Sequence, residues 1–249
     1  MNGLDVFRDA AAAPAIGPSR AGEIERQMSR LLVPGDVHEL RALGVTLPGE
    51  HPRTSLSGYF DNVEDLARAA AKIDGYARGV YYTLNPLRPE LLSRAPNRIE
   101  MGIDCATDGD VIRRRWLPLD FDPVRPKDSN ATDDELGTAI ERADLAWRQL
   151  RRRGWPEPVA ALSGNGVHLL YPIDLAPEDT LVRDVLRKLA RDLSDARVKL
   201  DAAVHNPSRI WKVYGTTPRK GSATSDRPLR PAVLLRGGLA SAGGLGDVL

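Results

Sequence analysis

The sequence lacks several features that would assign it to a specialised class of protein. Its 249 residues include one cysteine, Cys105, so neither an internal disulfide nor a cysteine-based zinc site can form. A reducing cytoplasm is the compartment that fits this. The Ala-rich N-terminal stretch is interrupted by charges and a proline, so we expect neither a signal peptide nor a membrane span.

An excess of charge of one sign is also lacking. Lys and Arg total 35 against 34 Asp and Glu, so any nucleic-acid partner has to be met by a local basic patch. Hydrophobic residues make up 42% and charged residues 28%, which is typical of a soluble globular protein. The length allows one large domain or two small ones.

The first half of the chain predicts an N-terminal α/β module over residues 22–115, preceded by a flexible segment over 1–21. Apolar residues with helical spacing predict helices, and β-branched or aromatic runs predict strands. The expected helices cover 22–33, 35–44, 63–73 after a cap at Asp61-Asn62, and a single turn at 89–93; the expected strands cover 54–60, 79–84 and 98–104.

The second half predicts a β-α-β-β-α-β unit over residues 116–236, the split βαβ order of ferredoxin-like and RRM folds. Its expected strands cover 116–122, 158–162, 167–173 and 198–204, and its expected helices run from a capping box at Thr132 to Gly154 and from Pro177 onward. The glycine-rich tail over 237–249 reads as a linker. We therefore expect an α+β fold.

The strand Trp116–Asp122 carries two acidic residues on one face. Side chains alternate along a strand, so Asp120 and Asp122 emerge on the face opposite Phe121. Two neighbouring anions repel each other unless a divalent cation or solvent lies between them. On this short motif alone, an exposed strand end with two solvated acids is the favoured interpretation, because short motifs recur by chance.

The predicted topology brings further polar residues to these acids. In a split βαβ sheet the first strand lies between the third and the fourth and is antiparallel to both, so Asp120 and Asp122 should meet His168 and Asp201. Carboxylates without cysteine or a second histidine favour Mg²⁺ or Mn²⁺ over zinc. Such ions align an attacking hydroxyl with the α-phosphate of a nucleotide.

Candidate phosphate-binding residues follow the acidic strand. The turn Ser163-Gly164-Asn165-Gly166 lets backbone N–H groups approach an anion, and His168 could donate to a phosphate oxygen. Arg209, Lys212 and Lys220 could clamp a triphosphate. A strand histidine satisfied within the core and a solvated basic loop are the structural alternatives.

Taken together, these motifs resemble the archaeo-eukaryotic primase superfamily, in particular the bacterial, phage and plasmid primase-polymerase domains. The family pattern of D-x-D, small-G-x-G-x-H-hydrophobic and hydrophobic-Asp stands here as Asp120-Phe121-Asp122, Ser163 to Leu169, and Leu200-Asp201. The resemblance extends to N-P-S-R-I-W-K-V-Y-G-T from Asn206, to S-G-Y-F from Ser57 and to Y-T-L-N-P from Tyr82.

The resemblance implies an α/β module packed on an RRM-like module, with the site in the cleft between them. It implies metal ligation by Asp120, Asp122 and Asp201, and triphosphate binding by Ser163, His168, Arg209 and Lys212. Members synthesise primers and many extend DNA, which implies a DNA template, a primer and nucleoside triphosphates as partners. We expect a helicase or another nucleic-acid module beyond the C-terminal tail.

Two other functions fit parts of the pattern. A nucleotide cyclase also uses two carboxylates on a ferredoxin-like palm, without a template. A non-catalytic RRM-like module would bind nucleic acid through aromatic side chains on its central strands. Tyr59 and Tyr82 are candidates for contact with the sugar of a nucleotide.

Overall fold

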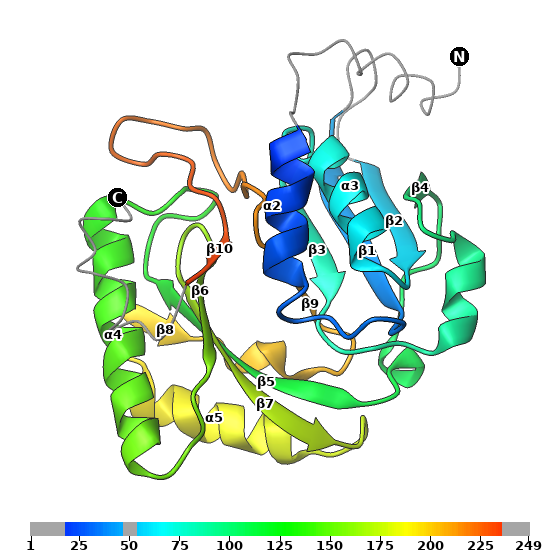
Figure 1. Cartoon of the computed structure of the whole chain (residues 1–249). Helices are drawn as coiled ribbons and strands as arrows, with labels where there is room; N and C mark the ends of the chain where they lie inside the picture. Colours follow the sequence, from blue (N-terminus) through cyan, green and yellow to red (C-terminus); the bar gives the residue numbers. More distant parts are fainter. Residues whose placement is uncertain (1–17, 47–53, 236–249) are drawn as a thin grey trace.

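The backbone forms two antiparallel sheets with helices packed on them, a mixed α+β arrangement (Figure 1). The computed structural model describes residues 18–46 and 54–235. Within these residues no helix combines the length and the apolar character that crossing a membrane requires. The glycine-rich tail over 237–249 and most of the N-terminal segment predicted over 1–21 lie outside the described residues.

The first sheet contains five strands in the order β4-β2-β1-β3-β9. The helices α2 and α3 pack against each other, and α3 also contacts β1 and β2 (Figure 1). The bounds are α2 Pro18–Met28, β1 His38–Val45, β2 Thr54–Phe60, α3 Val63–Ile73, β3 Gly79–Thr83, β4 Glu100–Met101 and β9 Ile210–Lys212, with 3-10 helices η2 Pro89–Arg94 and η3 Asp108–Asp110.

The second sheet has the order β10-β6-β7-β5-β8, with α4 and α5 packed against it. Its elements are β5 Arg114–Pro123, α4 Asp133–Arg152, β6 Val159–Leu162, β7 Val167–Leu175, α5 Leu181–Leu193, β8 Val198–Leu200, the 3-10 helix η4 Ala202–His205 and β10 Val233–Leu234. The strand β5 lies between β7 and β8 and is antiparallel to both. This is the position that the predicted β-α-β-β-α-β order required.

Local sequence signals account for several elements. The side chain of Asn62 accepts the N–H of Asp65 at 2.8 Å and starts α3, and Thr132 and Glu135 form the predicted capping box of α4. The β6–β7 hairpin is closed by a hydrogen bond from the Ser163 N–H to the Gly166 carbonyl at 2.9 Å. These predictions are confirmed.

The helix predicted over residues 35–44 is wrong, because His38–Val45 form the strand β1. Leu40 and Ala42 are fully buried in the core, with the alternation of a strand. The neighbouring Glu39 is buried too, because it accepts hydrogen bonds from Arg41 at 2.6 and 2.7 Å and from the Ala106 N–H at 2.9 Å. A charged residue normally indicates an exposed position, so the buried and hydrogen-bonded Glu39 hides the alternation of buried and exposed side chains that predicts a strand.

Other predicted boundaries need correction. The helix α2 begins at Pro18, inside the segment predicted to be flexible, and ends at Met28 rather than near residue 33. The strand predicted over 98–104 is reduced to β4. The helix expected from Pro177 begins at Leu181, whose N–H donates to the Asp179 side chain at 2.7 Å. The strand expected over 198–204 ends at Leu200, before η4.

The two sheets share one large hydrophobic core rather than two separate ones. The short strand β9 lies within the predicted second module but pairs with β3 of the first sheet. It therefore crosses the boundary predicted at residues 115 and 116. The ring of Trp211 in β9 packs against that of His168 in β7, with centroids 4.2 Å apart and planes tilted by 42°, and so joins the two sheets directly.

The buried carboxylate of Asp74 connects the C-terminal loop to the helices of the first sheet. The Asp74 side chain, 1% exposed, pairs with Arg20 of α2 and accepts hydrogen bonds from the Thr217 N–H at 3.1 Å and from Arg219 Nη1 at 3.3 Å. Removing one partner of a buried ion pair leaves the others without compensation.

We therefore expect Asp74→Ala to lower the free energy of unfolding by about 2–3 kcal/mol, measured by urea denaturation. Glu64→Ala in α3, the helix that Asp74 caps, is the matched control, because Glu64 pairs with Arg68 on the exposed surface and its loss should change stability little. Equal losses of unfolding free energy in the two variants would show that the Asp74 contacts do not stabilise the packing of the loop.

Candidate active site

The register of β5 places the predicted acidic residues on one face of the second sheet. Asp120 lies opposite His168 of β7, and Phe121 lies opposite Leu200 of β8. The Asp201 N–H donates to the Asp120 carbonyl at 2.9 Å, so the same register continues past β8 and sets Asp201 beside Asp120. Directly opposed residues point to the same face, and the buried Phe121 and Leu200 occupy the other face.

The Asp120 carboxylate is largely shielded from solvent, with 19% of its side chain exposed. Its Oδ1 lies 3.5 Å from His168 Nε2 and has no hydrogen-bond partner among the described residues. Burial raises the pKa of Asp120, but His168, Lys220 and Arg209 outweigh burial and hold this pKa below its ordinary value. Asp120 is therefore an anion with an unsatisfied oxygen.

Asp122 has the opposite shift. Burial and the charge of Asp120 raise the pKa of Asp122, although Arg125 and Lys220 oppose them. Arg125 Nη1 lies 3.2 Å from Asp122 Oδ1. The two carboxylates thus repel each other, which a cation between them would relieve.

The Asp201 carboxylate already has partners within the protein. Its Oδ1 accepts the Ala203 N–H at 2.7 Å as the cap of η4, and its Oδ2 lies 3.8 Å from Arg209 Nη2. Across residues 18–46 and 54–235, no group of three or more His, Cys, Asp or Glu side chains is arranged to hold a metal ion. The three predicted ligands share a face but do not form one ligand set in this arrangement.

The donor atoms nevertheless suit a hard divalent cation. The buried Asp120 Oδ1 lacks a partner within the described chain, and a second carboxylate on the same face raises the local negative charge. Carboxylate oxygens of this kind favour Mg²⁺ or Mn²⁺ over zinc. The chemistry of these donor atoms therefore suits the predicted metal, although the side chains of the described residues are not arranged as one ligand set.

His168 contacts two aromatic residues, Trp211 of β9 and Tyr214 just after that strand. Its Nδ1 lies 2.9 Å from the Tyr214 hydroxyl, which also accepts a hydrogen bond from Trp211 Nε1 at 2.9 Å. An indole N–H can only donate, so the Tyr214 hydroxyl accepts from Trp211 and keeps its own proton to donate to His168 Nδ1. Nδ1 is then an acceptor, and the ring proton of His168 is assigned to Nε2, which faces Asp120. His168 is 3% exposed.

The glycine turn between β6 and β7 packs against the acidic strand. A Cβ added to Gly166 would lie 2.4 Å from the Phe121 carbonyl oxygen and 2.9 Å from Asp122 Oδ1, so only glycine fits there. The Gly166 N–H donates to Ser163 Oγ at 2.9 Å. This N–H is already used inside the turn, which removes Gly166 from the backbone donors expected to be free for an anion.

The first sheet's edge contributes a buried lysine. Lys212 Nζ donates to the Tyr81 hydroxyl at 2.7 Å and lies 4.1 Å from the centre of the Tyr81 ring. Burial, followed by the charge of Lys220, lowers the pKa of Lys212 to about 7, with Asp120 and Asp122 acting in the opposite direction. Lys212 thus lies within the electrostatic reach of both carboxylates.

A basic pocket of about 380 Å³ adjoins Asp122. Arg125, Lys127, Lys199 and Lys220 are among its lining residues. Of these four residues, sequence reasoning singled out only Lys220 and missed Arg125, Lys127 and Lys199. It also missed Tyr81. Arg125 follows Asp122 by three residues, which was an available signal, whereas Tyr81 depends on the long-range pairing of β3 with β9.

The predicted sugar contacts find no support in their surroundings. Tyr59 is fully buried, and its hydroxyl donates to the Asp104 carbonyl at 2.6 Å, in a small separate core with Leu87. Tyr82 is fully buried within the main core. Neither side chain offers surface to a ligand in this structure.

Comparison with known proteins gave distant structural similarities. No family model and no curated protein matches the sequence. The crystal structure of primase RepB' is similar with a TM-score of 0.47 and 11% identity, over 88% of this chain and 56% of that one. The polymerase domain of Mycobacterium tuberculosis Ligase D in complex with DNA is similar with a TM-score of 0.47 and 16% identity, over 92% of this chain and 80% of that one.

The lowered pKa of Lys212 predicts a specific pH dependence of stability. Between about pH 7 and the pKa of about 10.4 of an unfolded lysine, the unfolded chain binds a proton that the folded chain lacks. The contribution of Lys212 to the free energy of unfolding should therefore rise with pH across this window. Below about pH 7 Lys212 is charged in both the folded and the unfolded chain. The folded protein then buries a charged ammonium group, and Lys212 lowers the free energy of unfolding by its full amount.

Urea denaturation at several pH values in metal-free buffer tests this expectation. The rise should be smaller in Lys212→Met than in the parent, whereas Lys72→Met, which alters an exposed lysine of α3, should behave like the parent. An unchanged pH profile in Lys212→Met would contradict the assigned burial.

Proposed function

We propose that this chain is a template-dependent nucleotidyltransferase, a DNA primase or polymerase that joins nucleoside triphosphates to a 3′-hydroxyl. The observation that carries the proposal is the shared face of the second sheet, where Asp120 and Asp122 lie with His168 and within electrostatic reach of Lys212. The sequence motifs around these residues, which resemble those of primase-polymerases, support it.

In this proposal, Asp120 and Asp122 hold divalent Mg²⁺ or Mn²⁺, with Asp201 as the third carboxylate. Such a cation, when bound, neutralises charge on the phosphate oxygens and activates the attacking hydroxyl. The unpartnered Asp120 Oδ1 and the raised pKa of Asp122 support a cation here, because a positive charge would stabilise both carboxylates in their ionised form.

The remaining polar groups would bind the triphosphate. His168, with Nδ1 satisfied by Tyr214, would donate its Nε2–H to a phosphate oxygen, and Ser163 would contribute its hydroxyl. Arg209, Lys212 and Lys220 would supply the positive charge that stabilises the departing pyrophosphate. Lys212 would take up a proton as the anion binds, because a nearby negative charge raises the pKa of an amine.

Primer extension on a DNA template with labelled nucleotides tests this function. We expect incorporation that requires Mg²⁺ or Mn²⁺ and that falls on the order of 100-fold or more in Asp120→Asn and in Asp122→Asn. Asp192→Asn is the matched control, because Asp192 pairs with Lys188 on the exposed surface of α5. Full activity in both site variants would contradict the proposal.

The same experiment separates the two rival functions. A nucleotide cyclase would release a cyclic product without template and would not lengthen a primer. A binding module would retain nucleic acid without consuming nucleotide, and its affinity would not depend on a divalent metal ion at Asp120.

A further inference from the structure

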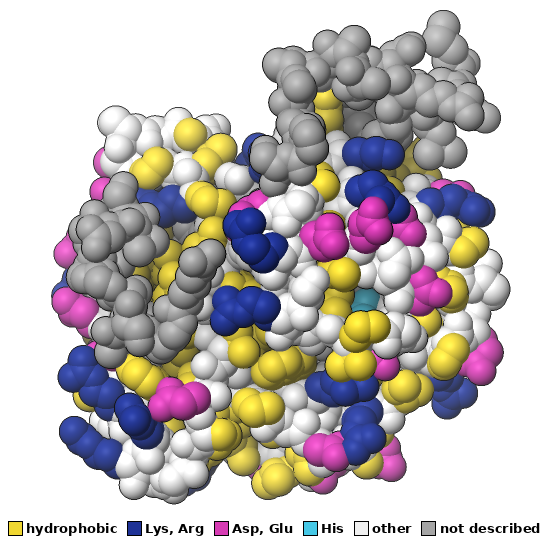
Figure 2. Space-filling view, in the orientation of Figure 1, with side chains coloured by type: hydrophobic (Ala, Val, Ile, Leu, Met, Phe, Trp, Pro, Cys, Tyr) yellow, Lys and Arg dark blue, Asp and Glu magenta, His cyan; other side chains and the backbone are white. Residues whose placement is uncertain are grey.

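The basic pocket beside Asp122 differs in charge from the rest of the surface. On the face that Figure 2 shows, basic and acidic side chains are interspersed. The charged lining residues of the basic pocket are the carboxylates Asp122 and Asp128 and the cations Arg125, Lys127, Lys199 and Lys220. A protein that is nearly neutral overall needs such a local excess of positive charge to bind nucleic acid.

The two carboxylates of the basic pocket already pair with arginines. Arg125 Nη1 lies 3.2 Å from Asp122 Oδ1, and Arg78 Nη2 lies 2.8 Å from Asp128 Oδ1. The three lysines of the pocket have no such partner, because the one lysine that pairs with a carboxylate in the described part of the chain is Lys188. Three ammonium groups therefore remain available to an anion.

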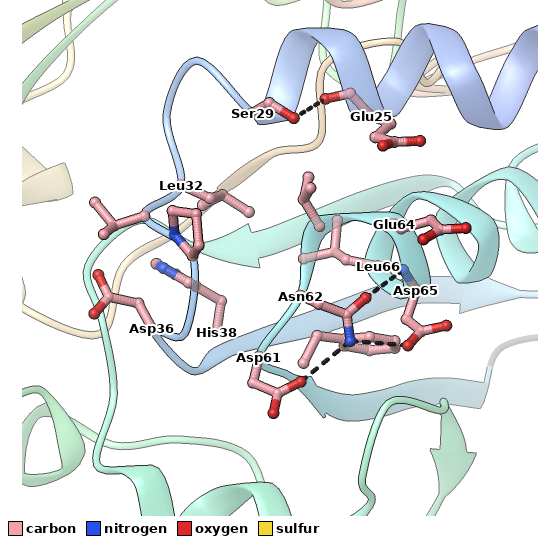
Figure 3. A pocket seen from close by; sticks show the side chains of 14 residues that line it. Glu25, Ser29, Leu32, Asp36, His38, Asp61, Asn62, Glu64, Asp65 and Leu66 are labelled. Carbon is pink, nitrogen blue, oxygen red and sulfur yellow. Dashed lines mark hydrogen bonds between the residues drawn. The ribbon is translucent and has the colours of Figure 1, made fainter.

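Another pocket, of about 500 Å³ between α2 and α3, has the opposite charge (Figure 3). It has no lysine or arginine among its described lining residues, and its charged lining residues are Glu25, Asp36, Asp61, Glu64 and Asp65. Carboxylates repel a phosphate group. Of these two pockets, only the basic one suits a phosphate.

The cations of the basic pocket gather around Asp122. Lys199 of β8 lies directly opposite Asp122 of β5, so the two side chains emerge on the same face of the sheet. Arg125, whose side chain is 10% exposed, contacts Asp122 from the loop after β5. The charge of Lys220 also acts on Asp122. The basic pocket is therefore continuous with the carboxylates of the candidate active site.

Two contacts hold the segment of Lys220 against the loop after β5. Arg78 Nη2 donates to the Lys220 carbonyl at 3.1 Å and to the Asp128 carboxylate at 2.8 Å. A Cβ added to Gly221 would lie 2.3 Å from the Asp128 carbonyl oxygen, so the two segments touch. Lys127, the neighbour of Asp128 in the chain, and Lys220 therefore lie on adjoining segments.

The basic pocket and His168 lie on opposite sides of β5. His168 of β7 is opposite Asp120, whereas Lys199 of β8 is opposite Asp122. In nucleotidyl transfer, the attacking hydroxyl and the departing pyrophosphate lie in line on either side of the α-phosphorus. A triphosphate that extends toward β7 therefore requires the 3′-hydroxyl to enter from the side of β8.

The lysines of the basic pocket suit a strand of any sequence. Lys127 and Lys199 are exposed, and an ammonium group is a point charge on a flexible stem. Contacts between such groups and backbone phosphates position a strand without reading its bases. A strand that is extended on varied templates needs contacts of this kind.

We propose that the basic pocket binds backbone phosphates of the primer strand beside its 3′-end, through Lys127 and Lys199. Lys220 lies between the primer and the triphosphate. This inference rests on the proposed nucleotidyltransfer and names the groups that hold the strand being extended. Lys127 and Lys199 are the residues to alter, because Arg125 also contacts Asp122 and Lys220 also belongs to the proposed triphosphate site.

Fluorescence anisotropy and primer extension with the full chain test this inference on the double variant Lys127→Gln, Lys199→Gln. Both side chains are exposed, so the fold should be retained. We expect Kd and KM for the primer–template to rise about tenfold, with KM for the nucleotide unchanged. The slope of log Kd against log salt should fall in magnitude by about 2, because two phosphate contacts are lost.

The matched control is the double variant Lys72→Gln, Lys188→Gln. It removes the same charge from exposed positions of α3 and α5, so it should change neither the affinity nor the salt slope.

Neutral methylphosphonate linkages separate the primer from the template. In the last two linkages of the primer, they should weaken binding to the parent and weaken binding to the Lys127→Gln, Lys199→Gln variant no further, because the lost charges are those that the lysines contact. In the paired linkages of the template, they should affect both proteins alike.

Three results would overturn the inference while a parent that extends primers upholds the proposed function. They are an unchanged primer–template affinity in the Lys127→Gln, Lys199→Gln variant, a higher KM for the nucleotide alone, and a methylphosphonate effect that the variant removes from the template instead of the primer. A parent that extends no primer would refute the proposed function, and this inference with it.

Discussion

The pairing of β5 with its two neighbours is the constraint on which the candidate active site depends. Because side chains alternate along a strand, a slip by one residue would turn Asp120 and Asp122 into the core and expose Phe121. The full burial of Leu119 and Phe121 makes such a slip costly. The close approach of Gly166 to the Phe121 carbonyl fixes the same register from the neighbouring hairpin.

The second determinant is the edge of the first sheet. Through β9 it brings Trp211 against His168 and the Lys212 ammonium within reach of the carboxylates. The three ionisable groups respond to burial and to one another: the pKa of Asp120 falls, that of Asp122 rises and that of Lys212 falls. Such shifts, caused by burial together with specific charge partners, are typical of functional sites.

The sequence predicted those features that depend on neighbouring residues or on a simple order of elements. The cap at Asn62, the capping box of α4 and the β6–β7 hairpin are local, and the place of β5 between β7 and β8 follows from the order of elements. From this order alone, the common face of Asp120 and His168 could be expected before the structure.

The elements that the sequence did not predict correctly depend on contacts between residues far apart in the chain. The sequence of β1 predicts a helix instead of a strand because the buried Glu39 is satisfied by Arg41 and by the distant Ala106, contacts that no local pattern reveals. The strand β9 pairs with a strand about 130 residues earlier, so the contact of Lys212 with Tyr81 could not be derived from spacing.

The most direct test of the central claim is a crystal structure of the protein grown with Mn²⁺ and a non-hydrolysable nucleoside triphosphate, with the metal located by anomalous scattering. The expected result is a manganese peak bound by Asp120 and Asp122, with the triphosphate extending toward His168 and Lys212. A bound nucleotide elsewhere on the protein, with no metal at these two carboxylates, would contradict the claim.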